Sequence, residues 1–342
     1  MRTPGRDIVV VAASAGGVEP LRTLLAGLPA GLPAAVLVVL HVPAQGNSVL
    51  AGILDRAGEL PAAPAVDGEE IRPGRVYVAR PDHHLLVSDG KVRLSRGPQH
   101  NGHRPAADPL FMSAALDAGP RVAAVVLSGT LDDGAKGSEA VHRRGGAVAV
   151  QSVGECAFTG MPSAALAAVP EAEELPVRKL TAWIEQQSRT PVRGEDPMPD
   201  DDLEREIDLL LRESPALGDP DGELIGFSCP TCNGPIYEQQ SERNIRYICR
   251  VGHAWSRYSM VDAQSNAVER ALWVAVQRLE ERVQMLQRMC RSAEERKQTL
   301  SLQYFREEEE RTREALETLR ALQSGIGRGA EAPAGAERGE SA

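Results

Sequence analysis

The first half of the chain alternates short apolar runs with stretches in which apolar residues recur at helical spacing. The runs contain no alternating polar positions, so each predicts a strand that is buried on both faces. They lie at residues 8–13, 35–40, 122–127 and 147–150, and the helical patterns lie at 18–28, 108–118 and 136–144. Strands that alternate with helices predict βαβ units, and hence an α/β fold with a doubly wound, mostly parallel sheet over residues 1–190.

A different pattern occupies residues 74–96, "GRVYVARPDHHLLVSDGKVRLSR". Alternating runs flank Asp89-Gly90, and a dipeptide of this kind is typical of a tight hairpin turn. We therefore expect an antiparallel hairpin that is inserted into the sheet or added at its edge.

Beyond residue 190 the pattern divides into four further segments. Residues 191–225 are acidic and contain prolines, which predicts a linker with one short amphipathic piece, "LEREIDLLLRE". Residues 226–258 hold most of the cysteines and predict a small ribbon-like unit. Residues 259–324 predict a long helix or a helical hairpin, because neither Gly nor Pro occurs between residues 262 and 322. Residues 325–342 are of low complexity and predict a disordered tail.

The long helical segment carries an apolar seam with strict 4-3 spacing, which is typical of a coiled coil. The seam consists of Leu272, Val276, Leu279, Val283, Leu286, Cys290 and Ala293. An apolar seam needs a partner helix. We expect either a homodimer through the C-terminal helix or a helical hairpin that folds back on itself.

Length, composition and charge narrow the class of protein. The chain has 342 residues, too many for one ordinary core, and its 42% apolar and 25% charged content is typical of soluble globular proteins. No apolar run approaches the ~18 residues of a membrane span, and the N-terminus has no signal-peptide layout. The net charge of −10 argues against a nucleic-acid partner. We expect a cytoplasmic protein that does not span a membrane.

Polar residues follow the ends of three apolar runs. Ser14 follows the first run, His41 follows the second, and Asp132 and Asp133 come shortly after the third. The carboxyl ends of parallel strands share one edge of a sheet, where such folds place their ligands. The stretch around Ser14 does not by itself decide between a glycine-rich phosphate cradle and a nucleophile on the turn, and a purely structural serine is equally consistent with it. The coincidence of all three residue types at one edge favours a nucleophile, a base and an orienting acid.

The cysteine-rich segment has the spacing C-x2-C-x16-C-x3-H. Three of the five cysteines lie within 21 residues, and without an export signal this favours a metal over disulfides. Cys229, Cys232, Cys249 and His253 predict a closed, tetrahedral zinc site. Such a zinc is structural, since four protein ligands leave no position for water. Buried free cysteines are the alternative, and the regular spacing argues against them.

Five segments of the first half resemble, in order, motifs of the catalytic domain of chemotaxis protein-glutamate methylesterases. They are "VVVAASAGGVEPLRTLLAGLP", "VLVVLHVPAQGNSVLAGIL", "GRVYVARPDHHLLV", "HRPAADPLFMSAA" and "VVLSGTLDDGAKG", and they fall between about residues 7 and 185. The resemblance implies hydrolysis of glutamate γ-methyl esters on the cytoplasmic helices of chemoreceptors, with release of methanol and no catalytic cofactor. Some members of the family also deamidate receptor glutamines.

The resemblance also assigns roles to individual residues. It makes Ser14 the nucleophile, His41 the base and Asp133 the orienting acid, whereas Asp132 falls where the family pattern varies. We expect Asp133 to accept a hydrogen bond from Nδ1–H of His41 while His41 takes the proton of the attacking Ser14. Four residues are candidates for the oxyanion and substrate contacts: Ala15, Gly16, Gly17 and Thr130. His83, His84, His103 and Arg104 are weaker candidates. Histidines at a hairpin are more typical of solvated polar residues, and Arg104 is more typical of a structural or substrate-positioning cation than of a catalyst.

The sequence departs from the family pattern in three places. Ala15 stands where the family commonly has threonine, and "SGT", with Thr130, replaces "TGM". The first strand begins near residue 7, so we do not expect the receiver domain of the familiar architecture. These departures keep two rivals open. One is a non-enzymatic signalling scaffold on a decayed hydrolase fold, and the other is an esterase with a non-receptor substrate. Expected partners are methylated receptor helices or related signalling proteins. A similar ribbon-and-helix appendage follows some methylesterase domains of the family.

Overall fold

The computed structural model describes residues 5–45, 48–192, 200–212, 219–240 and 245–326. The chain divides into two compact units, Met1–Val261 and Asp262–Ala342. The expected disordered tail, 325–342, lies almost wholly outside the described residues. Within the described residues, no helix is both long enough and apolar enough to cross a membrane.

The first unit is built on a seven-stranded sheet in which all pairs are parallel. Its order is β3-β4-β2-β1-β7-β8-β9. The strands are β1 (Ile8–Ala13), β2 (Ala35–Leu40), β3 (Ala62–Pro64), β4 (Val76–Val78), β7 (Val122–Val126), β8 (Ala147–Gln151) and β9 (Glu173–Leu175). The central strand β1 pairs with β2 on one side and β7 on the other. The strand order therefore reverses at β1, the point at which open α/β sheets bind ligands.

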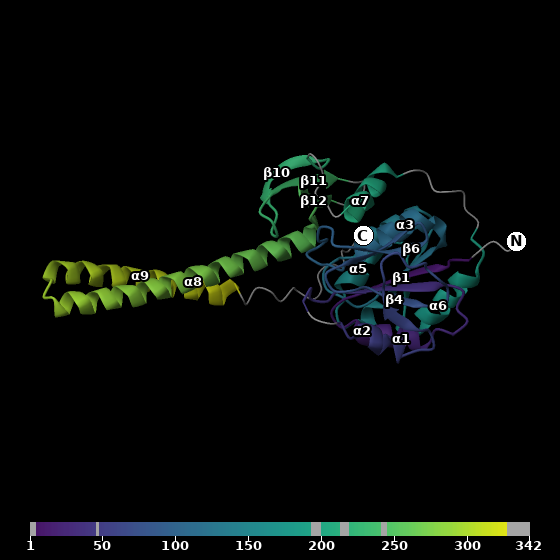
Figure 1. The fold of residues 1–342 in the computed structure, drawn as a ribbon, viewed down its shortest axis with the longest axis horizontal. Helices are drawn as coiled ribbons and strands as arrows, with labels where there is room; N and C mark the ends of the chain where they lie inside the picture. The colour runs from purple at the N-terminus through teal and green to yellow at the C-terminus, as the bar shows by residue number, and fades with distance from the viewer. Residues whose placement is uncertain (1–4, 46–47, 193–199, 213–218, 241–244, 327–342) are drawn as a thin grey trace, which may run out of the picture. The chain divides into compact units, whose positions relative to one another are not determined.

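Helices cover both faces of this sheet (Figure 1), which confirms the doubly wound α/β fold. One face carries α1 (Val18–Ala26), α2 (Leu50–Asp55) and α6 (Val177–Arg189), and the other carries α3 (Ala107–Ala118), α4 (Ala135–Arg143) and α5 (Gly160–Ala168). Successive β1 residues point to opposite faces. Val9 packs in the cluster that contains Leu21, while Val10 packs in the cluster that contains Phe111. This two-sided burial explains why the strands read as continuous apolar runs. Two short 3₁₀ turns, Gly119–Arg121 and Val153–Glu155, also lie in this unit.

The predicted hairpin is present, but its expected place in the sheet is wrong. Strands β5 (His84–Ser88) and β6 (Lys91–Ser95) form a separate two-stranded sheet. The turn between them places Asp89 at φ 54° and Gly90 at φ 67°, the left-handed pair that a tight hairpin turn requires. Its buried residues Leu85 and Val87 pack in the α3 side of the core. Polar alternation therefore identified the hairpin, whereas its packing against α3 as a separate sheet was not encoded locally.

The predicted linker contains a helix that packs on the sheet domain. Helix α7 (Asp201–Arg212) buries Leu203, Ile207 and Leu210 against Leu86 and Met112. Charge supplements these contacts, because Glu206 accepts from Lys136 Nζ at 2.6 Å and pairs with Arg246. Residues 201–212 thus belong to the folded unit, while residues 193–199 and 213–218 of the linker lie outside the described residues.

A second, antiparallel sheet follows α7 in the chain. Its strands are β10 (Glu223–Ser228), β11 (Pro235–Gln240), β12 (Ile245–Cys249) and β13 (Ala254–Ser256), paired in that order. We call it the four-stranded sheet. It holds the Cys/His residues that the spacing singled out.

Two helices complete the chain, α8 (Arg257–Glu295) and α9 (Thr299–Ile326). Of the two expected forms, the structure takes the helical hairpin (Figure 1). The chain turns at Lys297, which has a left-handed φ of 55°. Side chains pair across the two helices, with Arg282 donating to Glu308 at 2.8 Å and Gln287 donating to Glu309 at 3.1 Å.

Most of the apolar seam on α8 is buried within this hairpin, and its other two residues, Leu272 and Leu279, are half-buried. Val276, Val283, Leu286, Cys290 and Ala293 are at most 8% exposed. The fold-back hairpin therefore supplies the partner helix that the seam requires. A homodimer through this helix stays an untested prediction.

Candidate active site and Cys/His cluster

The sheet brings Ser14, His41 and Asp133 to one edge. Strands β1 and β2 are in register from Ile8 opposite Ala35 to Ala13 opposite Leu40. The ladder continues one residue further, because Ser14 N donates to Ser128 O at 2.9 Å and His41 N donates to Ala13 O at 3.2 Å. Ser14 and His41 are thus neighbours at the carboxyl edge, and the loop after β7 brings Asp133 beside them.

These three side chains form one continuous hydrogen-bonded chain. Nε2 of His41 lies 2.7 Å from Oδ2 of Asp133, and Nδ1 lies 3.0 Å from Oγ of Ser14. An ionised carboxylate only accepts, so Nε2 carries the ring proton and Nδ1 is left to accept from the Ser14 hydroxyl. The expectation that Nδ1 faces Asp133 is therefore wrong.

The strand order explains this orientation of the ring. His41 follows β2 and Asp133 follows β7, and β1, which ends in Ser14, lies between the two strands. The serine is adjacent in the ladder, so it meets Nδ1, the nitrogen nearer the backbone. The acid lies one strand further away and is reached by the distal nitrogen, Nε2.

Glycines make the turn after Ser14 sterically feasible. Gly16 has φ +70°, a conformation that side chains with a Cβ rarely adopt. A Cβ at Gly17 would lie 2.6 Å from Cβ of Ala13. The serine therefore sits on a compact strand-to-helix turn, with α1 beginning at Val18.

Asp133 is buried among donors at the N-terminus of α3. It is 2% exposed and accepts from the backbone N–H groups of Ala107 (2.5 Å) and Asp108 (3.2 Å) and from Nδ2 of Asn101 (3.1 Å). Burial by itself raises the pKa of Asp133, but the hydrogen bond and charge of His41, with the bond from Ala107, hold it well below its usual range. The carboxylate is therefore ionised throughout the neutral range.

A second buried carboxyl group lies beside it. Asp108 is 4% exposed and accepts from the N–H groups of Gly134 (3.0 Å) and Gly137 (2.7 Å) at the start of α4. Burial and the neighbouring charge of Asp133 raise the pKa of Asp108 to about 7. Asp133, which precedes α4, thus accepts hydrogen bonds from the N-terminus of α3, and Asp108, in the first turn of α3, accepts them from the N-terminus of α4. Asp108 lies in the segment "HRPAADPLFMSAA", but no sequence signal indicated that it would lie beside Asp133.

His103 stacks on the candidate base. Its ring centroid lies 3.8 Å from that of His41, with an interplanar angle of 14°. Burial, followed by the proximity of His41, lowers the pKa of His103 to about 4, so it is neutral at pH 7. A neutral, stacked ring restricts rotation of His41 without adding a competing charge.

The other secondary candidates have structural partners. Nδ1 of His83 is 3.0 Å from Pro81 O, and Nε2 of His84 is 2.9 Å from Pro98 O. Arg104 forms an ion pair with Asp82 and donates to Gly97 O at 2.7 Å. None of these contacts reaches Ser14 or His41.

The candidate oxyanion residues surround Ser14 but differ in what their N–H groups do. Gly17 N donates to Ser14 O at 3.0 Å, so this donor is already used. Within the described residues, the N–H groups of Ala15, Gly16 and Thr130 have no protein acceptor. Ser128, which sequence reasoning missed, fixes this turn by donating from Oγ to Ala15 O at 2.9 Å.

Asp132 is separated from the histidine. Its Oδ1 accepts from Oγ of Ser256 at 2.6 Å, and burial raises its pKa. Of the two adjacent aspartates, only Asp133 contacts His41.

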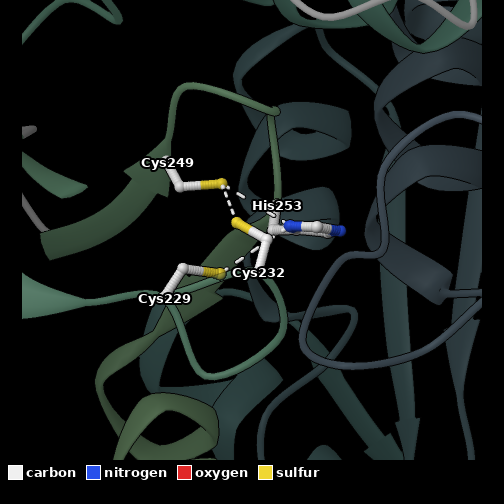
Figure 2. A group of neighbouring side chains, drawn as sticks. All are labelled: Cys229, Cys232, Cys249 and His253. Carbon is white, nitrogen blue, oxygen red and sulfur yellow. Dashed lines mark hydrogen bonds between the residues drawn. The ribbon is translucent and has the colours of Figure 1, made fainter. Parts of the chain in front are cut away.

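The four predicted metal-binding residues also converge. Cys229, Cys232, Cys249 and His253 place their ligand atoms within 4.8 Å of one another (Figure 2). Sγ of Cys232 is 3.6 Å from Sγ of Cys249, and Nδ1 of His253 is 3.5 Å from Cys249 and 3.7 Å from Cys229. A tetrahedral zinc with Zn–S bonds of about 2.3 Å separates its sulfur ligands by about 3.8 Å. The donor set and spacing therefore fit four-coordinate zinc.

Two tight turns present these ligands. In the first, Cys229 N donates to Gly234 O and Asn233 N donates to Cys229 O, both at 2.8 Å. In the second, Gly252 N donates to Cys249 O at 2.8 Å and Cys249 N donates to His253 O at 3.1 Å. Both turns lie at the same end of the four-stranded sheet, where Ile236 pairs with Cys249, so one ion would join its two hairpins.

Fold and site together define a doubly wound α/β protein with a Ser-His-Asp constellation at its switch point. The chain belongs to the CheB methylesterase family, whose model matches residues 9–184. The resemblance inferred from the motifs is thereby confirmed for the first half of the chain, and the residues after 184 lie outside the match.

Individual relatives agree with the family match. Protein-glutamate methylesterase/protein-glutamine glutaminase 5 of Myxococcus xanthus is 38% identical over 192 residues, which is 55% of each chain. Protein-glutamate methylesterase/protein-glutamine glutaminase 3 of Anaeromyxobacter dehalogenans is 44% identical over 167 residues, which is 48% of this chain and 49% of the relative. The chain thus spans about half the length of these relatives. The solved catalytic domain of the Thermotoga maritima CheB methylesterase is 35% identical with a TM-score of 0.50, covering 53% of this chain and 97% of that domain.

Buried histidines predict a pH dependence of stability. Burial lowers the pKa of His84 to about 4, so between roughly pH 6.5 and 4 the unfolded chain binds a proton that the folded chain does not. The contribution of neutral His84 to the free energy of unfolding is therefore fully present above pH 6.5 and decreases as the pH falls toward 4. We expect the unfolding free energy of the wild type to fall more steeply over this range than that of His84→Gln, by up to about 1.4 kcal/mol per pH unit. Urea unfolding at a series of pH values measures both slopes, and equal slopes would contradict the assignment.

Proposed function

We propose that this chain is a protein-glutamate methylesterase that hydrolyses glutamate γ-methyl esters on the cytoplasmic helices of chemoreceptors. The observation that carries the proposal is the unbroken hydrogen-bonded chain from Asp133 through His41 to Ser14. The activity for which the relatives are named supports the same reaction, and a cytoplasmic place of action follows from the substrate. Glutamine deamidation by the same site is the related second reaction.

Acylation follows from the geometry of the three side chains. Asp133 fixes the ring tautomer by accepting from Nε2–H, so Nδ1 takes the proton of Ser14 as Oγ attacks the ester carbonyl carbon. The carbonyl oxygen becomes an oxyanion that the free N–H groups of Ala15, Gly16 or Thr130 are suited to stabilise. When the tetrahedral intermediate collapses, the proton on Nδ1 passes to the methoxide, and methanol leaves.

Deacylation repeats these steps with water as the nucleophile. His41 removes a proton from water, the hydroxide attacks the acyl-serine carbonyl, and the proton returns to Ser14 as the glutamate carboxylate is released. With a glutamine substrate the leaving group is ammonia and the product is the same. A backbone oxyanion site is compatible with Ala15 and Thr130, because the N–H group does not depend on the side chain.

We further propose that the Cys/His cluster holds one structural zinc. Its four nitrogen and sulfur donors would fill a tetrahedral shell, so the ion would supply no open position for chemistry. The four-stranded sheet is too small to bury a sizeable core. A bound ion would stabilise it by linking its two turns.

Catalysis should require all three members of the triad. We expect Ser14→Ala and His41→Ala to lower methanol release from methylated receptor fragments by several orders of magnitude. Asp133→Asn should lower it by about 10⁴-fold, as in a serine protease whose triad acid becomes an amide. The matched control is Asp132→Asn, which changes the adjacent acid and should retain far more activity.

The outcomes separate the rivals. An inactive wild type with intact fold would favour the non-enzymatic scaffold. Turnover of a simple methyl ester but not of receptor fragments would favour a different substrate. An Asp132→Asn variant that is more impaired than Asp133→Asn would show that the wrong acid was assigned.

The metal proposal predicts about one zinc ion per chain. Cys229→Ser should lower the zinc content measured by elemental analysis and speed amide hydrogen exchange in residues 223–256. The control is Cys156→Ser, since Cys156 lies in the sheet domain and donates to Ser152 O at 3.4 Å. Equal zinc content in the two variants would exclude the cluster as the ligand set.

A further inference from the structure

One asparagine connects the catalytic acid to the four-stranded sheet. Nδ2 of Asn101 donates to Oδ1 of Asp133 at 3.1 Å and to Oδ2 of Asp108 at 3.2 Å. Oδ1 of the same amide accepts from Ser256 N at 3.0 Å and from Oγ of Ser259 at 2.9 Å. Both hydrogens and both lone pairs of the amide are therefore engaged.

The partners of Asn101 come from two parts of the sequence. Its donors face the carboxylates at the switch point, whereas its acceptor faces β13 and the first turn of α8, more than 150 residues further along the chain. Because an amide group is planar and rigid, anchoring Oδ1 also fixes the direction in which Nδ2 points. The serines thus determine where the donor lies relative to Asp133.

This network is shielded from water. Asn101 is 8% exposed, Ser259 2% and Asp133 2%. Hydrogen bonds at buried sites are stronger than at the surface, and losing one partner leaves the other unsatisfied. The arrangement is therefore sensitive to the loss of either serine.

The backbone around Asn101 is held by the same sheet. Asn101 N donates to Ala254 O at 2.8 Å, and Ala254 N donates to Gln99 O at 3.2 Å, so the loop pairs with β13 as an additional strand would. Asn101 has φ 51°, in the left-handed region that asparagine and glycine tolerate best. Neighbouring His100 accepts from Arg246 on β12 at 2.9 Å, and Arg246 in turn pairs with Glu206.

We propose that Asn101 is a positioning residue of the triad and that the four-stranded sheet completes the active site by holding it. Ser256 and Ser259 orient the amide, the amide orients the carboxylate of Asp133, and the carboxylate orients His41. This inference rests on the proposed esterase function. The four-stranded sheet would then contribute to catalysis by orienting Asn101, in addition to binding a metal.

The test uses the full chain and two variants. Asn101→Gly removes the amide while preserving the left-handed backbone, and Ser259→Ala removes one anchor but leaves the amide. Asp89→Gly is the control for the first, because Asp89 has a similar φ of 54° in an exposed turn. Ser163→Ala, on the exposed face of α5, is the control for the second.

Two readouts distinguish positioning from general stability. The first is kcat and KM for methanol release. The second is the ¹H NMR resonance of His41 Nε2–H, which the bond to a buried carboxylate displaces downfield. A misplacement of about 1 Å costs on the order of 10²-fold in rate. We expect Asn101→Gly to lower kcat about 10- to 100-fold with little change in KM and to shift the resonance, and Ser259→Ala to do the same to a lesser extent.

The outcomes separate this inference from the function on which it rests. If the wild type turns over and both variants keep its kcat and its resonance, the positioning role is wrong. A change in KM alone would also overturn it. If the wild type releases no methanol, the proposed function fails, and the resonance still shows whether Asn101 positions Asp133. Should Asn101→Gly not fold, Ser259→Ala decides the matter by both readouts.

Discussion

The structure depends on one geometric constraint, which is that neighbouring parallel strands end at the same edge. Because β1 lies between β2 and β7, the residues that follow these three strands must meet. The apolar runs that bury the sheet on both faces therefore also position Ser14, His41 and Asp133. The same order sets which ring nitrogen faces which partner, since the serine lies one strand from the histidine and the acid lies two strands away.

Burying an ionised acid at this edge has a cost that the surroundings must offset. Asp133 receives hydrogen bonds from His41, from two backbone N–H groups at the start of α3 and from Asn101. The hydrogen bond and charge of His41, with the hydrogen bond from Ala107 N–H, hold the pKa of Asp133 low, while the pKa of the neighbouring Asp108 is raised to about 7. Asp133 therefore remains charged beside His41, and Asp108 reduces the repulsion between the two carboxyl groups by binding a proton more readily. The Asn101 amide lies between the two carboxyl groups and donates to both.

Local sequence patterns predicted most of the fold and the identities of the site residues. Unbroken apolar runs gave β1, β2, β7 and β8, and ligand spacing gave the Cys/His cluster. The features that local patterns did not predict depend on contacts between segments that are distant in the sequence. Ile207 packs near Leu86, so a helix in the acidic segment belongs to the folded unit. Asn101 joins Asp133 to Ser259, and nothing near residue 101 indicates this.

The central claim is that this edge of the sheet activates Ser14 as a nucleophile. Labelling with a fluorophosphonate, followed by peptide mapping in a mass spectrometer, tests it without reference to any natural substrate. The account predicts one phosphonyl adduct per chain, on the peptide that contains Ser14, and slow labelling of the same residue in His41→Gln. A folded wild-type chain that remains unlabelled at Ser14, or that labels at the same rate without His41, would contradict it.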